Sequence, residues 1–571
     1  MTFSFLHRPG RGDVSRRAGT HPSSRRASRG LGTHLASAFL SIPLLMFWAG
    51  SAALGADVTT YHNNNARQGL NPQETVLTPA NVNASTFGKL FTIAADGVID
   101  AQPLYLSSVS IPGQGTHNVL YAVTENDTVY AFDADTGATL WHVSALQTGE
   151  TPSDTRGCSQ ITPEIGITST PVIDRTSGAH GTLYVVAMSK DSSQNYTQRV
   201  HALDLTTGQE EFGGPVAVQA QYPGNGDGSQ GGNVIFDPKQ YAERAGLLLL
   251  NHVIYTAWTS HCDFRPYTGW LIGYNESTLA QVSVLDVTPN GNEGAIWQAG
   301  AGLASDGSSL YFLDANGTFD TTLNSQGFPN LGDYGNAFVR VSTAGHKLAV
   351  ADYFTMYNTV EESDADEDLG SGGALLLPPM KDAGGATWYL ALGGGKDGAI
   401  YIVNRNNMGK FNPSNDSAIY QEIDNALPGG LWSMPASFGG AVYFGPQGSN
   451  LLQFKFSNAR LSSSPTSKSA AIFEYPGSTP SVSSNGLKNA IVWAVEHSNT
   501  SVLHAYSAAN LARELYNSNQ ASGGRDQFGQ ASHFGTPTIV NGKVYVGTTA
   551  GVAVFGLLGT GNAGDSASGA R

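Results

Sequence analysis

The chain has few of the residues that several common classes of protein depend on. Its 571 residues include only two cysteines, and only 13% are charged. Acidic residues outnumber basic ones by 45 to 30, and seven arginines lie within residues 1–34, so the remainder is more acidic still. We therefore expect no nucleic-acid partner and no binding to anionic membranes, because phosphates need Lys and Arg. Gly-x-Ser-x-Gly, His-Glu-x-x-His, Walker and Cys-x-x-Cys motifs are also absent.

Helical periodicity and long apolar runs are nearly absent as well. The one long apolar run, residues 35–48, follows the basic residues 1–34 and precedes the small residues 49–56. This order predicts a cleaved export signal over residues 1–56, and hence a periplasmic or extracellular protein. Arg25 and Arg26 weakly favour a twin-arginine route. The alternative is an uncleaved signal anchor, which would be the chain's only link to a membrane.

Glycine and a repeated pattern are abundant. The 69 glycines and 26 prolines punctuate short runs of alternating polarity, as a chain of short strands requires. The clearest unit is VLYAVTENDTVYAFDADTGATLW, in which two such runs flank a polar turn before Asp-x-x-Thr-Gly and a final aromatic. It occupies residues 119–141, and weaker copies occupy residues 182–212, 253–286, 387–411, 441–456, 491–511 and 543–557.

Repeats of about 40 to 60 residues with four short strands are typical of a β-propeller, since one such sheet cannot bury both faces alone. Seven units fit between residues 102 and 519 if residues 310–312 and 338–354 form a divergent fourth. The last unit, residues 534–558, lacks an outer strand, and residues 86–97 resemble an orphan outer strand.

These observations predict an all-β fold: an eight-bladed propeller of four-stranded blades over residues 57–560. Pairing of the N-terminal and C-terminal strands would close it and remove its open edges. Residues 561–571 are expected to be a disordered tail. Cys158 and Cys262 fall in loops of neighbouring units, and in an oxidising compartment we favour a disulfide over two buried thiols.

The aromatic–Asp-x-x-Thr-Gly-x-x-x-Trp unit resembles the repeat of quinoprotein alcohol dehydrogenases, which bind pyrroloquinoline quinone (PQQ) at the propeller axis. The resemblance covers nearly all of the chain after the signal, including residues 61–82, which are similar to the segment before the family's first blade. It implies that Trp297 forms the floor under the quinone and that Asn316 is a Ca²⁺ ligand. Asp368 matches the family's catalytic aspartate, and Lys396 matches a contact to the quinone oxygens.

Other implied contacts are less specific. Trp432, in GGLWSMP, is similar to a tryptophan near the axis, and Ser169 and Asp100 match cofactor-contacting positions more loosely. In this scheme Ca²⁺, held by Asn316 and Asp368, polarises the quinone carbonyl as a Lewis acid. Asp368 takes the proton of the alcohol while the quinone accepts hydride.

The chain departs from this family at three places. It has no pair of adjacent cysteines, only Cys158 in that region. The family's glutamate ligand to Ca²⁺ has no clean counterpart, although Asp191, Gln194 and Asn195 lie nearby. Leu431 stands where an asparagine is expected.

Each candidate also has a purely structural interpretation. The two tryptophans can simply pack between blades, and Asn316 and Lys396 can simply occupy turns. Asp368 ends an acidic run, residues 361–368, which can be a solvated loop or a separate Ca²⁺ loop.

Two functions of different classes follow. The first is a PQQ- and Ca²⁺-dependent dehydrogenase that oxidises an alcohol or a sugar. The alternative is a non-catalytic binding propeller that recognises a polysaccharide or an envelope protein, because a fold does not fix a function. A lyase or hydrolase using axial carboxylates, such as Glu164 and Glu293, also stays open.

Overall fold

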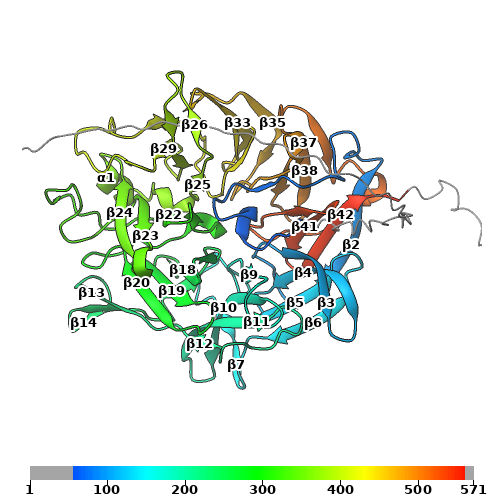
Figure 1. Ribbon diagram of the computed structural model, residues 1–571, viewed down its shortest axis with the longest axis horizontal. Coiled ribbons are helices and arrows are strands. Elements are labelled where there is room, and N and C mark those ends of the chain that lie inside the picture. Colours follow the sequence, from blue (N-terminus) through cyan, green and yellow to red (C-terminus); the bar gives the residue numbers. More distant parts are fainter. Residues whose placement is uncertain (1–55, 560–571) are drawn as a thin grey trace, which may run out of the picture. The chain divides into compact units, whose positions relative to one another are not determined.

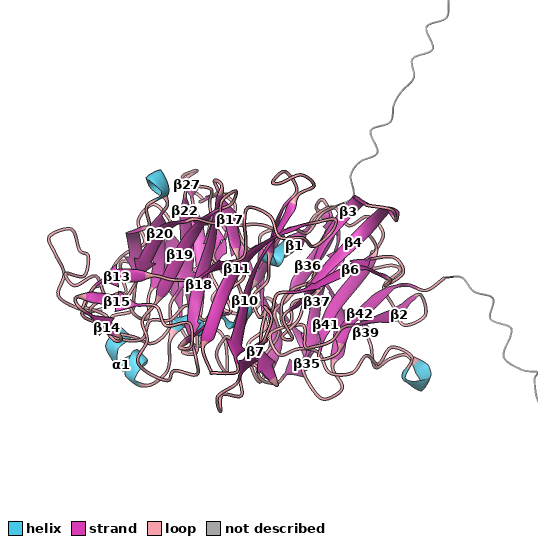
Figure 2. Cartoon of the chain, turned by 90° about the horizontal axis from the view of Figure 1, so that it is seen from below, coloured by secondary structure: helices cyan, strands magenta, loops and turns pink. Residues whose placement is uncertain are grey.

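The structure is a computed structural model that describes residues 56–559. The predicted tail and all but the last residue of the predicted signal lie outside the described residues. Within residues 56–559 strands predominate, and α1 (Thr359–Asp364) is the single α-helix. Figure 2 shows that strands and loops make up almost all of this part of the chain. The all-β prediction is confirmed, and no helix in this range is long and apolar enough to cross a membrane.

Within the described residues the strands form ten sheets, and the eight larger ones follow one another around a common centre (Figure 1). In the first half of the chain the larger sheets comprise β3 (Leu104–Ile111), β4 (Gly115–Val123), β5 (Thr128–Asp133) and β6 (Thr139–Ser144); β7 (Glu150–Asp154), β8 (Glu164–Ile165), β9 (Val172–Asp174), β10 (Thr182–Asp191), β11 (Tyr196–Asp204) and β12 (Val216–Ala217); β16 (Tyr241–Glu243), β17 (Leu248–Leu250), β18 (Val253–Ser260), β19 (Trp270–Asn275) and β20 (Gln281–Asp286); and β21 (Ala304–Ser305), β22 (Ser309–Leu313), β23 (Phe338–Ser342) and β24 (Ala349–Phe354).

In the second half they comprise β25 (Leu375–Leu376), β28 (Leu390–Gly393), β29 (Ile400–Asn404) and β30 (Gln421–Ile423); β31 (Ala436–Phe438), β32 (Ala441–Phe444), β33 (Ser449–Ser457), β34 (Arg460–Leu461) and β35 (Ser467–Phe473); β1 (Leu70–Asn71), β36 (Ser481–Asn485), β37 (Lys488–Glu496), β38 (Val502–Ser507) and β39 (Glu514–Asn517); and β2 (Phe87–Ala94), β40 (Thr538–Val540), β41 (Lys543–Thr548) and β42 (Gly551–Leu557). Two small sheets hold β13 (Gln221–Pro223), β14 (Ser229–Gln230) and β15 (Asn233–Ile235), and β26 (Met380–Lys381) and β27 (Thr387–Trp388).

Short 3₁₀ turns complete the described elements. They are η1 (Tyr61–Asn63), η2 (Gln298–Gly300), η3 (Ala344–His346), η4 (Leu369–Ser371) and η5 (Ser522–Gly524). The divergent unit expected at residues 310–312 and 338–354 is a regular sheet, β21 to β24. β2, from the orphan segment at residues 86–97, pairs antiparallel with β42 at the other end of the chain.

Four tyrosines of the repeats join neighbouring sheets. Each lies in an inner strand, is buried, and donates its hydroxyl to a backbone carbonyl just after the second inner strand of the following sheet. This bond satisfies a carbonyl that the strand ladder leaves free, and in two of the four pairs that carbonyl belongs to an Asp-x-x-Thr-Gly turn. The pairs are Tyr121–Leu205 (2.9 Å), Tyr184–Glu276 (2.9 Å), Tyr443–Ala508 (2.7 Å) and Tyr545–Ala134 (3.1 Å).

Residues 57–74, here called the central segment, lie at the centre of the sheets (Figure 1). Their backbone carbonyls accept hydrogen bonds from the first strands of several sheets in turn. These include Ile173 N to Thr59 O (2.8 Å), Ser305 N to Asn65 O (2.6 Å), Leu376 N to Ala66 O (3.0 Å), Ser437 N to Gln68 O (2.9 Å) and Val482 N to Gly69 O (2.7 Å).

Arg67 anchors the central segment. Its side chain is fully buried and donates to the carbonyls of Tyr61 (2.7 Å) and Leu303 (2.7 Å), with a longer bond to that of Leu247 (3.2 Å). Burial lowers the pKa of this guanidinium to about 9. A buried cation is tolerated here because converging carbonyl dipoles surround it.

Candidate functional site

Five of the seven site residues predicted from the sequence line a single cavity. They are Trp297, Asn316, Asp368, Lys396 and Trp432. Each comes from a loop that precedes the first strand of a sheet or follows its second strand. The central segment accepts hydrogen bonds from residues within those first strands, whereas the cavity residues precede these strands in the chain or follow the second strands. The cavity therefore lies toward the start of the first strands.

Close backbone packing brings Asp368 to Lys396. Asp368 directly precedes η4, and Lys396 lies in the turn between β28 and β29, where its N–H donates to Asp368 O at 2.9 Å. A Cβ at Gly395 would lie only 2.1 Å from the Asp368 carbonyl oxygen, so only glycine permits this approach.

The two side chains form an ion pair. Asp368 Oδ2 lies 2.7 Å from Lys396 Nζ, and the Asp368 side chain is 2% exposed. Burial raises the pKa of Asp368, while Lys396 opposes that rise. Burial alone would lower the pKa of Lys396, but the Asp368 and Asp366 carboxylates outweigh it and raise that pKa. The pair is therefore a positioned carboxylate with a matched cation.

Asn316 contributes an unused oxygen. Its Nδ2 donates to Asp366 Oδ1 at 2.6 Å, whereas its Oδ1 is buried without a hydrogen-bond partner in the described chain. The positive-φ turn that its Asn-Gly sequence favours is not adopted by Asn316. A buried acceptor without a donor is costly and is typical of a site that receives a ligand.

The tryptophans add flat apolar surface. Trp297 and Trp432 are both partly buried, and Trp432 meets Tyr475 edge-to-face with ring centroids 6.0 Å apart. Trp297 also packs against the core between the sheets of β10 and β18, so it has the structural role as well as a place in the cavity wall.

The remaining two predicted residues do not line this cavity. Ser169 is buried near Glu243, whose pKa burial raises well above its usual value. Asp100 lines a neighbouring cavity of about 310 Å³ together with His533. Gln160 lines both cavities, so the two share part of their walls, and Asp100 belongs to the second one.

Arg244 is a cavity residue that the sequence did not reveal. It is 3% exposed, and its guanidinium forms no hydrogen bond or ion pair within residues 56–559. Its Cζ lies 4.2 Å from the centroid of the Phe534 ring, which also lines the cavity. Burial lowers the pKa of Arg244, and the charge of Asp100 opposes that change. A buried guanidinium without an anion is costly, and a carboxylate of a bound ligand would pair with it.

Asp263 is a second missed residue. It lines the cavity, and its Oδ1 accepts from Ser260 Oγ (2.9 Å) and Tyr267 OH (3.0 Å). The negative charge of Asp263 also raises the pKa of Asp368. Its effect is smaller than those of burial, Lys396 and Asp366. The only signal in the sequence was its position directly after Cys262.

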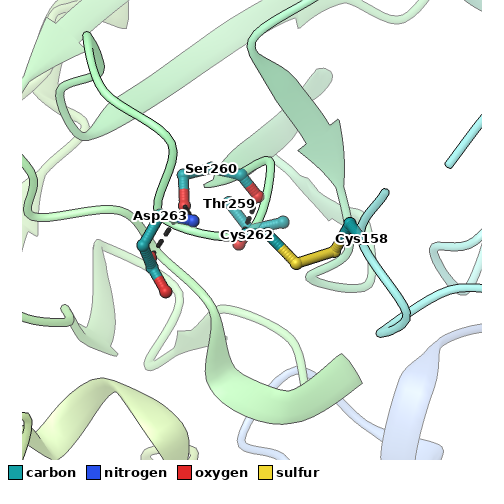
Figure 3. Close-up of a disulfide and its surroundings, with 5 residues drawn as sticks. All are labelled: Cys158, Thr259, Ser260, Cys262 and Asp263. Atoms are coloured by element: carbon teal, nitrogen blue, oxygen red, sulfur yellow. Dashed lines mark hydrogen bonds between the residues drawn. A yellow bond between two sulfur atoms is a disulfide. The ribbon is translucent and has the colours of Figure 1, made fainter. Parts of the chain in front are cut away.

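The expected disulfide is present and borders the cavity. Cys158 and Cys262 are bonded with Cα atoms 5.8 Å apart (Figure 3). Gln160 and Asp263, each within two residues of a bonded cysteine, both line the cavity. The disulfide therefore ties together two loops of the cavity wall.

Metal ligands are sparse in this region. Among the described residues, no three His, Cys, Asp or Glu side chains are grouped closely enough to hold a metal ion. Asp191, considered above for a missing ligand, instead accepts from the backbone of Ser193 and Asn195 in an exposed turn. Asp263 is the carboxylate that accompanies Asn316 and Asp368 in the cavity.

Comparison with known proteins identifies the fold. No protein-family model and no curated protein sequence matches the chain. A quinohemoprotein alcohol dehydrogenase from Comamonas testosteroni superposes with a TM-score of 0.60 at 14% identity, over 91% of this chain and 83% of its own. One from Pseudomonas putida HK5 gives 0.57 at 13% identity, over 90% and 82%. A europium-containing methanol dehydrogenase gives 0.58 at 11% identity, over 88% and 98%. The chain thus has the quinoprotein alcohol dehydrogenase-like β-propeller fold, as the repeats indicated.

Proposed function

We propose that the chain is an exported, PQQ- and Ca²⁺-dependent dehydrogenase that oxidises an alcohol or a sugar in the periplasm or outside the cell. One observation carries this proposal: Trp297, Asn316, Asp368, Lys396 and Trp432 line a single cavity together with the unpaired Arg244. The fold shared with alcohol and methanol dehydrogenases supports it.

The proposed architecture is a single propeller over residues 57–560 with eight blades, closed where β2 joins β42. Residues 1–56 would direct export and be removed. The disulfide between Cys158 and Cys262 supports an oxidising compartment, because such bonds rarely persist in the cytosol.

The residues of the cavity suit a flat, acidic ligand. Arg244 and Lys396 would bind carboxylate or carbonyl oxygens, and the two tryptophans would pack on its faces. Asp368 would hold the substrate hydroxyl and receive its proton, and Lys396, 2.7 Å away, favours the ionised form of this buried carboxylate. Bound PQQ would supply the hydride acceptor that no side chain provides.

Few oxygen donors in the cavity are available to Ca²⁺. Asn316 Oδ1 is a buried oxygen without a partner, and Asp368 and Asp263 add carboxylates to the same cavity. Oxygen donors of this kind suit a hard cation. We propose Asn316 and Asp368 as ligands, with Asp263 as the further carboxylate.

The cavity must enlarge to admit a ligand of the size of PQQ. Its volume is about 70 Å³, whereas small-molecule pockets usually measure about 300–1,000 Å³. Tyr475 lines the cavity and is 49% exposed, so turning its ring toward solvent would enlarge the site. Binding should therefore change the environment of Tyr475 and of Trp432, which it contacts.

A PQQ titration tests the proposal. Tryptophan fluorescence of the mature chain is followed as PQQ is added with and without CaCl₂. We expect saturable quenching that CaCl₂ strengthens, and oxidation of an alcohol or a sugar with an artificial electron acceptor. Arg244→Met should weaken PQQ binding about tenfold or more, whereas exposed Lys381→Met should not.

Asp368→Asn should retain PQQ binding and lose turnover. If PQQ with Ca²⁺ causes no saturable change in the wild-type chain, the proposal is wrong. The chain would then be better described as a binding propeller for a polysaccharide or an envelope partner.

A further inference from the structure

A second, larger cavity lies beside the candidate site and is lined by acidic side chains. It has a volume of about 910 Å³ and is formed by α1, the turn between β28 and β29, and residues 414–425. We call it the acidic cavity; its carboxylates are Glu362, Glu367, Asp397, Asp416, Glu422 and Asp424.

The acidic run at residues 361–368 divides between the two cavities. Asp366 and Asp368 pair with Lys396, whereas Glu362 and Glu367 line the acidic cavity. Glu361 and Asp364 are exposed, as in a solvated loop, whereas Glu362 and Asp368 are buried. The proposed oxidation uses neither Glu362 nor Glu367.

No lysine, arginine or histidine lines the acidic cavity. Burial raises the pKa of Glu362 to about 8, and Asp397 contributes to this shift. Burial likewise raises the pKa of Glu422 to about 7, with Asp416 and Asp424 adding to it. Tyr420 also lines the cavity, and Arg460 stacks on its ring at 4.0 Å without forming an ion pair with any described residue. None of the six carboxyl groups thus has a paired cation within the described chain.

Glu362 distinguishes this cavity from a solvated acidic surface. Its side chain is 9% exposed, and Oε1 accepts from Asn358 Nδ2 at 2.9 Å. Its other oxygen, Oε2, is buried and has no hydrogen-bond partner among the described residues. A carboxylate held in this way gains a partner only when a donor enters the cavity.

The size and walls of the acidic cavity indicate the kind of donor. No three of its carboxylates are close enough to hold one metal ion. Tyr357 lines it and is 51% exposed, and an accessible aromatic ring beside carboxylates suits an organic ammonium group. From the unpartnered Glu362 oxygen, the six carboxylates and the volume, we propose that the acidic cavity binds a small linear polyamine through its ammonium groups.

Calorimetric titration with spermidine tests this proposal on the mature chain without PQQ, at low ionic strength and pH 8. We expect one spermidine to bind per chain. Combining Glu362→Gln with Glu422→Gln should weaken binding about tenfold or more. These variants should fold, because they remove carboxylates that burial disfavours. Exposed Glu361→Gln removes one carboxylate from the same helix, outside the cavity lining, and should alter affinity less than about twofold.

Three outcomes would overturn the proposal. One is the absence of saturable spermidine binding, and another is equal weakening by Glu361→Gln and by the double variant, which would indicate a diffuse surface effect. The third is binding of Ca²⁺ alone at least as tightly as spermidine, with loss of that binding in the double variant; the cavity would then be a metal site. None of these depends on whether PQQ binds.

Discussion

Asp368 and Lys396 are joined twice, by a 2.9 Å backbone hydrogen bond and by a 2.7 Å ion pair between their side chains. Asp368 is almost fully buried, so its charge depends on this one partner that reaches it from the turn after β28. The ion pair favours the ionised form of the Asp368 carboxyl group. It also makes the stability of the fold depend on Lys396.

The first prediction concerns this pair. Lys396→Met leaves a buried carboxylate without its cation, which should lower the free energy of unfolding by about 3–5 kcal/mol. This loss should be larger at pH 8 than at pH 5. Without Lys396 the pKa of the buried Asp368 is higher still, so the unfolded chain releases a proton that the folded chain retains, and stability falls as pH rises. Urea unfolding at both pH values measures it.

Adding Asp368→Asn to Lys396→Met should recover most of that loss, since no buried charge is left. Exposed Lys381→Met is the matched control and should have little effect. Additive losses in the double variant would show that the two side chains do not act as a pair.

The second prediction concerns the tyrosines that join sheets. Tyr545→Phe removes the 3.1 Å bond to Ala134 O and leaves this buried carbonyl without a donor among the described residues. The free energy of unfolding should fall by about 1–2 kcal/mol. Tyr389→Phe is the control, because that ring is 41% exposed and its hydroxyl has no hydrogen bond within residues 56–559. Equal effects of the two changes on chemical denaturation would contradict a joining role.

These tyrosines also explain how far the fold could be predicted from the sequence. Tyr121 and Tyr545 each bond to an Asp-x-x-Thr-Gly turn of the neighbouring sheet, so in these units a local pattern records a contact between units. The central segment has no such pattern. Arg67 bonds to carbonyls 180 and 236 residues away, and nothing near it in the chain indicates those partners.

The candidate site was predictable where a short motif carries the geometry. Gly395 before Lys396 allows the approach to Asp368, and both residues belong to segments that resemble a known family. Arg244 and Asp263 belong to no motif. They became visible only when the fold placed them in the cavity wall, because spacing along the chain does not record which loops converge.

The third prediction concerns the disulfide. Replacing Cys158 and Cys262 together by Ser should lower the free energy of unfolding by about 2–4 kcal/mol, since the bond closes a long loop. Hydrogen exchange should accelerate most in residues 155–163 and 259–267, which carry Gln160 and Asp263. Mass spectrometry of peptides from both proteins measures this. A reducing agent should reproduce the effect in the wild type and add nothing in the variant; uniform exchange changes would show that the bond does not organise these loops.

The fourth prediction uses the raised pKa of Glu362, about 8 in the folded chain against 4.5 for a free side chain. Burial is the main cause, with Asp397, Glu367 and Asp416 adding to it and the Asn358 hydrogen bond opposing it. Between these two values the folded chain holds a proton that the unfolded chain has released. Stability contributed by this group is therefore present at low pH and is lost as pH rises toward 8.

Glutamine cannot ionise, so Glu362→Gln should unfold at nearly the wild-type temperature near pH 4.5 and about 1–3 °C higher by pH 8. Differential scanning calorimetry across this range, without added cations, measures the difference. Glu361→Gln, exposed on the same helix, should give no difference that grows with pH. If both variants behave alike, Glu362 is solvated in the folded chain and the acidic cavity loses its buried, unpartnered oxygen.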